Sequence, residues 1–276
     1  MTTEAFFLPL SGGSRFCVFH APPARTIRGG FVYVHPFAEE MNKSRRMAAL
    51  QSRALADAGH AVLQIDLLGC GDSSADFGDA TWSGWVDDVV AACHWLVDRA
   101  RVPLWLWGLR AGCLLAAEAA QRVDEPCNFL FWQPMHVGKV ALQQFLRLKV
   151  ASELLTGQGR SLMEDMRRQL ARGESVEVSG YALSPELSRG LEAATLDPPR
   201  SRGGGRRLEW LELSARGDES LSPASSQAIE RWRAAGVSVR SRVIEGVPFW
   251  QTVEVEDAPK LLAATLAAIL PLAEVS

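Results

Sequence analysis

The most unusual candidate site residue is an arginine between two glycines. The segment reads Gly108-Leu109-Arg110-Ala111-Gly112, and it lies between an apolar run and an alanine-rich stretch predicted to be helical. Glycines at both ends permit a sharp strand-to-helix turn, which holds the central residue in a strained conformation. Many enzymes present a nucleophile this way, but a guanidinium stays protonated and has no nucleophilic lone pair. Arg110 could instead stabilise negative charge on a reacting oxygen or hold an anionic ligand.

The glycine spacing and its position match the nucleophile elbow of α/β-hydrolases. In that arrangement the backbone N–H after the central residue, here Ala111, supplies half of an oxyanion hole. The other N–H is expected from the loop after an earlier strand, at Phe37 or Ala38. Cys113 follows the turn, but the helix should rotate it to another face, so we interpret it as a packing residue.

The sequence offers a candidate for the acid of a serine–histidine–acid triad but none for its histidine. Asp218 lies in a Gly-Asp loop after an apolar run, where these hydrolases carry the carboxylate, although an ordinary turn residue is an equally good interpretation. The histidine should follow later in the chain, in the loop 245–251. All five histidines lie at or before His136, so the usual triad chemistry is not available.

A dense group of polar residues directly follows the buried strand predicted at Phe31–Val34. His35 is the first of them, and two adjacent carboxylates, Glu39 and Glu40, come soon after. A metal site formed by these three residues has only one histidine to support it, so we predict no metal and no cofactor.

We expect this polar loop and the turn at Arg110 to form one site, because the carboxyl ends of the strands in such a sheet lie at the same edge. A buried arginine requires a carboxylate partner or an anionic ligand, so Arg110 should pair with Asp218 or Glu40. The predicted catalytic candidates are Arg110, Asp218, Glu40 and His35, the oxyanion-hole donors are the N–H groups of Ala111 and Phe37, and the pocket residues are Glu39, Asn42, Arg45 and Trp250.

Alternating strands and helices predict an α/β fold with a mostly parallel, doubly wound sheet. A hairpin formed by Phe6–Leu10 and Phe16–Phe19 precedes this alternation. The run Val102–Trp107 is apolar on both faces, which is typical of a strand at the centre of a covered sheet. Ser222 and Pro223 are typical of the start of a helix, and Val237–Ile244 alternates as an edge strand would.

Residues 137–200 interrupt this alternation. The segments 142–155 and 163–170 have helical patterns, and no buried strand is evident. We therefore predict an α/β-hydrolase core over residues 1–136 and 201–276, with a helical lid inserted at 137–200.

The composition limits the classes of function. The chain has 276 residues, of which 47% are hydrophobic and 22% charged, and its formal net charge is -3, so nothing indicates nucleic-acid binding. The five cysteines show no CxxC spacing, which favours buried thiols in a reducing compartment. The N-terminus does not have the pattern of a signal peptide, and the apolar segment 263–272 is too short to span a bilayer. We predict a cytoplasmic protein that could still contact a membrane peripherally.

Three segments resemble one family of α/β-hydrolase-fold proteins, exosortase A system-associated hydrolase 2. They are His35-Pro36-Phe37-Ala38-Glu39-Glu40-Met41-Asn42-Lys43-Ser44-Arg45-Arg46-Met47, Gly108-Leu109-Arg110-Ala111-Gly112 and Pro248-Phe249-Trp250-Gln251-Thr252. The resemblance implies a place in bacteria that sort PEP-CTERM proteins and make exopolysaccharide. It implies no substrate, because the label of hydrolase rests on the fold.

Three hypotheses about function follow. In the first, the protein hydrolyses an ester, thioester or related acyl bond, with Glu39, Glu40 or His35 as base toward water and with Arg110 and Ala111 stabilising the oxyanion. In the second, it is inactive and binds an anionic acyl, phosphate or carboxylate ligand through Arg110. In the third, a tryptophan-rich surface around the lid contacts export or polysaccharide machinery.

Overall fold

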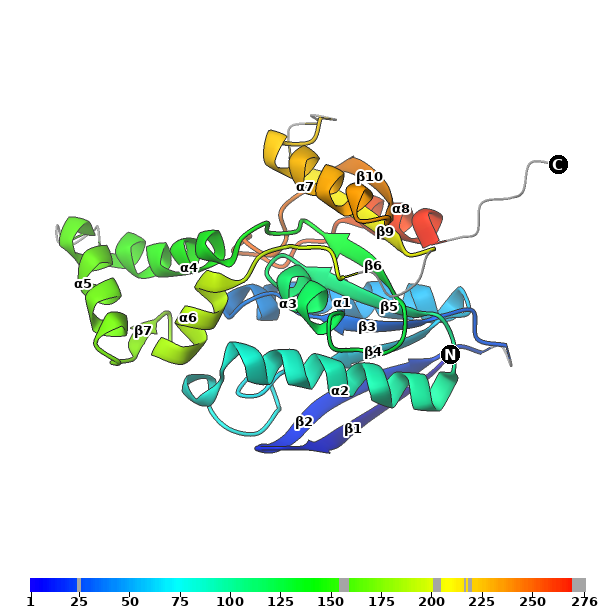
Figure 1. The fold of residues 1–276 in the computed structure, drawn as a ribbon, viewed down its shortest axis with the longest axis horizontal. Helices are drawn as coiled ribbons and strands as arrows, with labels where there is room; N and C mark the ends of the chain where they lie inside the picture. The colour runs from blue at the N-terminus through cyan, green and yellow to red at the C-terminus, as the bar shows by residue number, and fades with distance from the viewer. Residues whose placement is uncertain (24–25, 154–158, 201–204, 216, 218–219, 270–276) are drawn as a thin grey trace.

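An eight-stranded sheet forms the centre of the molecule (Figure 1). The computed structural model describes residues 1–269 apart from 24–25, 154–158, 201–204, 216 and 218–219. The strand order is β1-β2-β4-β3-β5-β6-β9-β10, with β1 and β2 antiparallel and the other six strands mutually parallel. The strands are β1 (Thr2–Leu10), β2 (Gly13–Ala21), β3 (Gly30–Val34), β4 (Ala61–Ile65), β5 (Leu104–Leu109), β6 (Cys127–Trp132), β9 (Arg207–Ser214) and β10 (Ser238–Glu245). This confirms the predicted mostly parallel sheet with an N-terminal hairpin.

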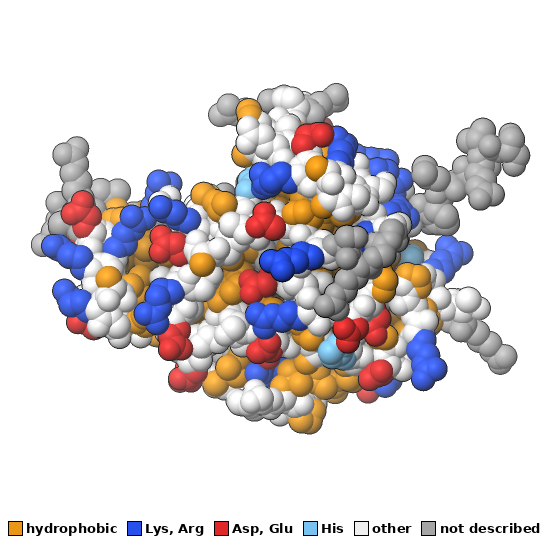
Figure 2. All heavy atoms as spheres, viewed as in Figure 1, with side chains coloured by type: hydrophobic (Ala, Val, Ile, Leu, Met, Phe, Trp, Pro, Cys, Tyr) orange, Lys and Arg blue, Asp and Glu red, His pale blue; other side chains and the backbone are white. Residues whose placement is uncertain are grey.

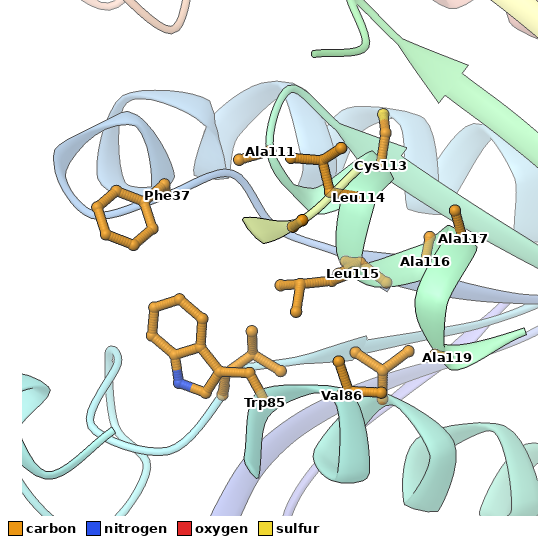
Figure 3. Packing of buried hydrophobic residues seen from close by; sticks show 14 of the residues in the cluster. Phe37, Trp85, Val86, Ala111, Cys113, Leu114, Leu115, Ala116, Ala117 and Ala119 are labelled. Atoms are coloured by element: carbon orange, nitrogen blue, oxygen red, sulfur yellow. The ribbon is translucent and has the colours of Figure 1, made fainter. Parts of the chain in front are cut away.

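Helices cover both faces of the sheet. On one face α1 (Glu39–Asp57) and α8 (Pro259–Ile269) pack on a cluster that includes Tyr33, Trp107 and Trp132. On the other face α2 (Trp82–Ala100), α3 (Gly112–Ala119) and α7 (Pro223–Ala234) contribute to the larger cluster, part of which Figure 3 shows. Both faces of β5 are therefore buried, as its wholly apolar sequence predicts.

Helix ends follow the signals in the sequence. Ser222 caps α7, because its side chain accepts a hydrogen bond from the Ser225 N–H, and Pro223 is the first helical residue. Gly59 follows the end of α1 with a φ of 95°, a conformation that glycine adopts without a steric penalty.

Residues 137–200, the predicted lid, lie between β6 and β9 and project from one end of the sheet (Figure 1). We refer to them as the inserted segment. It contains α4 (Gly138–Glu153), α5 (Gly159–Ala171), a hairpin of β7 (Val176–Val178) and β8 (Tyr181–Leu183), and α6 (Pro185–Ala193). The hairpin and α6 were not predicted, although Ser184 and Pro185 form the same start signal as α7. Gly190 of α6 packs closely on α2, since a Cβ at that position would lie 2.3 Å from Trp82 Cβ.

The tryptophans form no surface around the inserted segment, so that part of the third hypothesis is wrong. Eight of the nine are buried and Trp95 is partly buried. They lie in the core because their large apolar rings fill the space between sheet and helices. Within the described ranges, none of the helices has both the length and the apolar character that crossing a membrane requires.

Candidate functional site

The turn between β5 and α3 holds Arg110 in a left-handed conformation, with a φ of 55°. Such a conformation is costly for a residue with a side chain, so the surroundings must enforce it. A Cβ at Gly108 would lie 2.6 Å from Cys113 Cα, and one at Gly112 would lie 2.3 Å from the Val34 carbonyl oxygen. The two glycines are therefore required, and Gly112 brings the turn against the end of β3.

Two loops near Arg110 contain backbone N–H groups that donate to none of the described residues. Ala38, which precedes α1, has a φ of 48°, and Phe37 and Ala111 both line one cavity. In the described part of the chain, the N–H groups of Phe37, Ala38 and Ala111 have no hydrogen-bond acceptor. Figure 3 shows Phe37 and Ala111 on adjoining loops at the edge of the hydrophobic cluster. Free N–H groups on two such loops could stabilise an oxyanion.

Arg110 connects three segments that are distant in the sequence. Its Nε donates to Glu40 Oε1 at 3.2 Å, and Nη2 donates to Gln144 Oε1 at 2.6 Å. The guanidinium carbon also lies 5.4 Å from the centre of a Trp250 ring, a cation–π contact. The Arg110 and Glu40 side chains are only 10% and 12% exposed, so this ion pair is largely shielded from water. Arg110 thus ties α1, the inserted helix α4 and the loop after β10 together.

A cavity of about 230 Å³ adjoins this cluster. Its wall is mainly apolar, with polar groups from α1, from α4 and from the loop after β10. Apolar pockets with a few polar groups are typical of small-molecule sites. The lining residues are Phe37, Glu39, Glu40, Lys43, Ala111, Met135, Ala141, Gln144, Phe145, Leu148, Trp250 and Gln251.

The two carboxylates at the cavity differ in their surroundings. Burial raises the pKa of Glu39 to about 7, with a further increase from Glu40 and opposing effects of its own backbone N–H, Lys43 and Arg110. Glu39 Oε2 is buried and has no hydrogen-bond partner among the described residues. Burial also raises the pKa of Glu40, although Arg110 opposes the shift. Glu39 is thus the carboxylate free to exchange a proton near neutral pH.

His35 lies outside the cavity wall, and both of its ring nitrogens are in use. Nδ1 lies 2.8 Å from the Pro36 carbonyl oxygen, and Nε2 accepts from the Leu67 N–H at 3.3 Å. Burial lowers the pKa of His35, which favours the neutral ring. This histidine joins the ends of β3 and β4. The described residues contain no group of three His, Cys, Asp or Glu that could hold a metal ion.

Cys113 is fully buried, and its Sγ lies 3.9 Å from the Trp132 carbonyl oxygen. In Figure 3 its side chain points away from Phe37. Burial raises the pKa of the thiol well above its ordinary value, so the reactive thiolate is disfavoured. Asp218, the predicted acid, lies outside the described residues.

Asn42 and Arg45, expected in the pocket with Glu39, line a second cavity instead, together with Tyr181 of β8. Each residue advances an α-helix by about 100°, so these two point to a different side of α1 from Glu39 and Lys43. Arg45 pairs with Asp66 at 2.9 Å, and Asn42 Nδ2 donates to the Tyr181 hydroxyl at 3.4 Å.

Gln144 is a site residue that could not be identified from the sequence. It lies on α4, and a glutamine on a helix carries no signal that would distinguish it from a solvated residue. The only available signal was the general expectation that a lid would cover the site.

Comparison with solved structures identifies the fold. No family model matches the sequence, and no curated protein matches it. The structure is similar to a thermostable carboxyl esterase from Bacillus coagulans (TM-score 0.60, 13% identity, 89% of this chain and 91% of that one). It is also similar to Est1E from Butyrivibrio proteoclasticus (0.60, 15%, 96% and 95%) and to mouse alpha/beta hydrolase domain-containing protein 10 (0.59, 15%, 96% and 98%). With the strand order and the turn at Arg110, these similarities show that the chain has an α/β-hydrolase fold.

Proposed function

We propose that the protein hydrolyses a small uncharged acyl compound, an ester or thioester, by direct attack of water. The observation that carries this proposal is the Glu39 side chain, which lines a cavity together with Phe37 and Ala111 and has one carboxylate oxygen without a hydrogen-bond partner among the described residues. A general base works best when its pKa lies near the operating pH, and the pKa of Glu39 is about 7.

In this mechanism Glu39 accepts a proton from water as the water oxygen attacks the acyl carbon. The N–H groups of Phe37 or Ala38 and of Ala111 stabilise the negative charge that develops on the carbonyl oxygen. The tetrahedral intermediate then expels an alkoxide or thiolate, to which Glu39 returns the proton. No residue is acylated. Arg110 acts as a positioning residue, because it holds Glu40 and Gln144 in the cavity wall.

Hydrolysis of p-nitrophenyl esters and acyl thioesters with short chains tests this proposal. We expect kcat/KM to rise with pH through about 7, because only ionised Glu39 can accept the proton. Glu39→Gln should lower the rate about a hundredfold or more. The matched control is Glu186→Gln, since Glu186 also lies in the first turn of a helix but is exposed and outside the cavity.

Two results would contradict the mechanism. One is full activity of Glu39→Gln, and the other is labelling by a fluorophosphonate, which reports a serine nucleophile. Either would show that the reacting group has been misassigned.

A second candidate function is binding of a small anion without turnover. Arg110 Nη1 donates to none of the described residues, so its two N–H groups remain for a carboxylate or phosphate. Glu39 and Glu40 at the same cavity would repel such a ligand, which is why we prefer hydrolysis. No turnover of any ester, with thermal stabilisation by acetate or phosphate, would support binding. A role beside exosortase or polysaccharide machinery remains a prediction from the family resemblance.

A further inference from the structure

A separate cavity of about 310 Å³ lies inside the inserted segment, between α4, α5 and α6. It shares α4 with the cavity at Glu39 but uses another face of that helix, since Leu142 lines it whereas Ala141 and Phe145 line the other. Its lining residues are Leu142, Arg167, Leu170, Ala171, Pro185, Ser188, Arg189 and Glu192. Nothing in the proposed hydrolysis uses this cavity.

Part of the wall is apolar. Leu142 and Leu170 are 4% and 8% exposed, and Pro185 lies beside them. Figure 2 shows Lys and Arg side chains among exposed hydrophobic ones over this part of the molecule. A cavity of this size, at the lower end of the range for small-molecule pockets, suits a short hydrocarbon chain.

A buried hydroxyl also faces the cavity. Ser188 is only 4% exposed and lines the cavity, and no hydrogen bond joins its hydroxyl to another described residue. The Ser188 hydroxyl can therefore donate a hydrogen bond to a ligand in the cavity.

Two arginines at the same cavity have no ion-pair partner in the described ranges, although their neighbours do. Arg168 and Arg172 pair with Asp165 and Glu174, whereas Arg167, on the same helix, pairs with none of the described residues. Arg189 likewise pairs with none of the described residues, although Glu192 lies three positions further along α6. Two guanidinium groups beside a hydroxyl can bind a carboxylate.

We propose that this cavity binds the anion of a medium-chain fatty acid. The carboxylate contacts Arg167, Arg189 and Ser188, and the chain lies against Leu142 and Leu170. Glu192 disfavours a doubly charged head group such as phosphate, because like charges at one site repel. The proposal concerns a site distinct from the one at Glu39 and does not depend on hydrolysis.

Calorimetric titration of the full chain with octanoate, butanoate, octanol and inorganic phosphate tests this site. Octanoate should bind about tenfold or more tightly than butanoate, because four further methylenes are buried. Octanol should bind much more weakly because it lacks the carboxylate, and phosphate because it lacks the hydrocarbon chain. Arg167→Ala/Arg189→Ala should raise the octanoate Kd about tenfold, and Ser188→Val should raise it severalfold.

Two control variants separate this site from the rest of the molecule. Arg168→Ala removes an exposed charge from the same helix and should leave the octanoate Kd unchanged. Glu39→Gln should also leave it unchanged, whatever the outcome for hydrolysis. The proposal is overturned if octanoate does not bind, if octanol binds equally well, or if the double variant binds like the wild type.

Discussion

At the scale of single residues, the ion pair of Arg110 and Glu40 decides the character of the site. Both side chains are nearly excluded from water, so each charge depends on the other for its compensation. The contact to Gln144 and the Trp250 ring complete the surroundings of the guanidinium. Removing one partner should therefore lower the free energy of unfolding much more than removing both.

We predict that Arg110→Met lowers the free energy of unfolding by about 3 kcal/mol, because Glu40 is left buried without its partner. The double variant Arg110→Met/Glu40→Met should recover most of that loss. Urea unfolding measures both. Arg46→Met is the control, since the Arg46–Asp257 pair is exposed and screened by water, so its loss should change stability much less. Equal losses in the single and double variants would contradict this account.

The raised pKa of Glu39 predicts a pH dependence of stability. The folded state holds this proton up to a pH of about 7, whereas the unfolded chain loses it near the ordinary value of 4.5. Stability from this group therefore falls as the pH rises from about 4.5 to about 7. Glu39→Gln should remove that fall, so the variant gains stability relative to the wild type at pH 8 compared with pH 4. Parallel stability curves for the two proteins, from urea unfolding across this range, would contradict the raised pKa.

Some site residues can be predicted from the sequence and others cannot, for physical reasons. The pairing of Arg110 with Glu40 was one of two expected options, because a buried guanidinium requires a nearby carboxylate. Gln144 could not be predicted, since the orientation of α4 depends on tertiary packing. Asn42 and Arg45 were predicted to line the same pocket as Glu39 because they are close to it in sequence. The helical periodicity of α1 directs their side chains to another cavity instead.

At the scale of elements, the first two turns of α1 separate two cavities. Glu39, Glu40 and Lys43 face one, and Met41, Asn42 and Arg45 face the other. The strands were predicted from apolar runs, and the mostly parallel sheet from the rule for parallel crossovers. The full strand order was not predicted. The β7–β8 hairpin was missed because its two three-residue strands are too short to show a periodic pattern.

The close contact of Gly112, the first residue of α3, with the end of β3 predicts how a substitution there affects stability. Gly112→Ala should cost about 2 kcal/mol or more in urea unfolding, because its Cβ would lie 2.3 Å from a backbone oxygen that cannot move freely. Gly78→Ala is the matched control, since its nearest contact would be an ordinary 3.5 Å. Similar stabilities for the two variants would contradict this account, because they would show that α3 can move away from the end of β3 at little cost.

At the scale of the whole molecule, the sheet and the inserted segment should differ in how readily they open. The strands β5 and β6 lie in the middle of the sheet with their side chains largely buried, whereas exposed residues predominate in the described part of α5. Local opening requires less free energy where fewer apolar contacts are lost.

Hydrogen exchange followed by mass spectrometry should therefore show different rates of amide exchange in these elements. We expect amides of α5 to exchange about a hundredfold faster than those of β5, with α6 between them because Gly190 anchors it on Trp82. Equal protection of α5 and β5 would mean that the inserted segment opens only with the sheet.

The three contacts of Arg110 also constrain the mutational paths open to this protein. Exchange of Arg110 for serine would place a hydroxyl at the turn, but it would leave Glu40 without its ion pair and Gln144 without its donor. It would gain no base, because Trp250 lies beside this position and no histidine follows residue 136. Each single step toward a serine–histidine pair thus lowers stability before it can raise activity. Selection acting on one substitution at a time would retain the arginine.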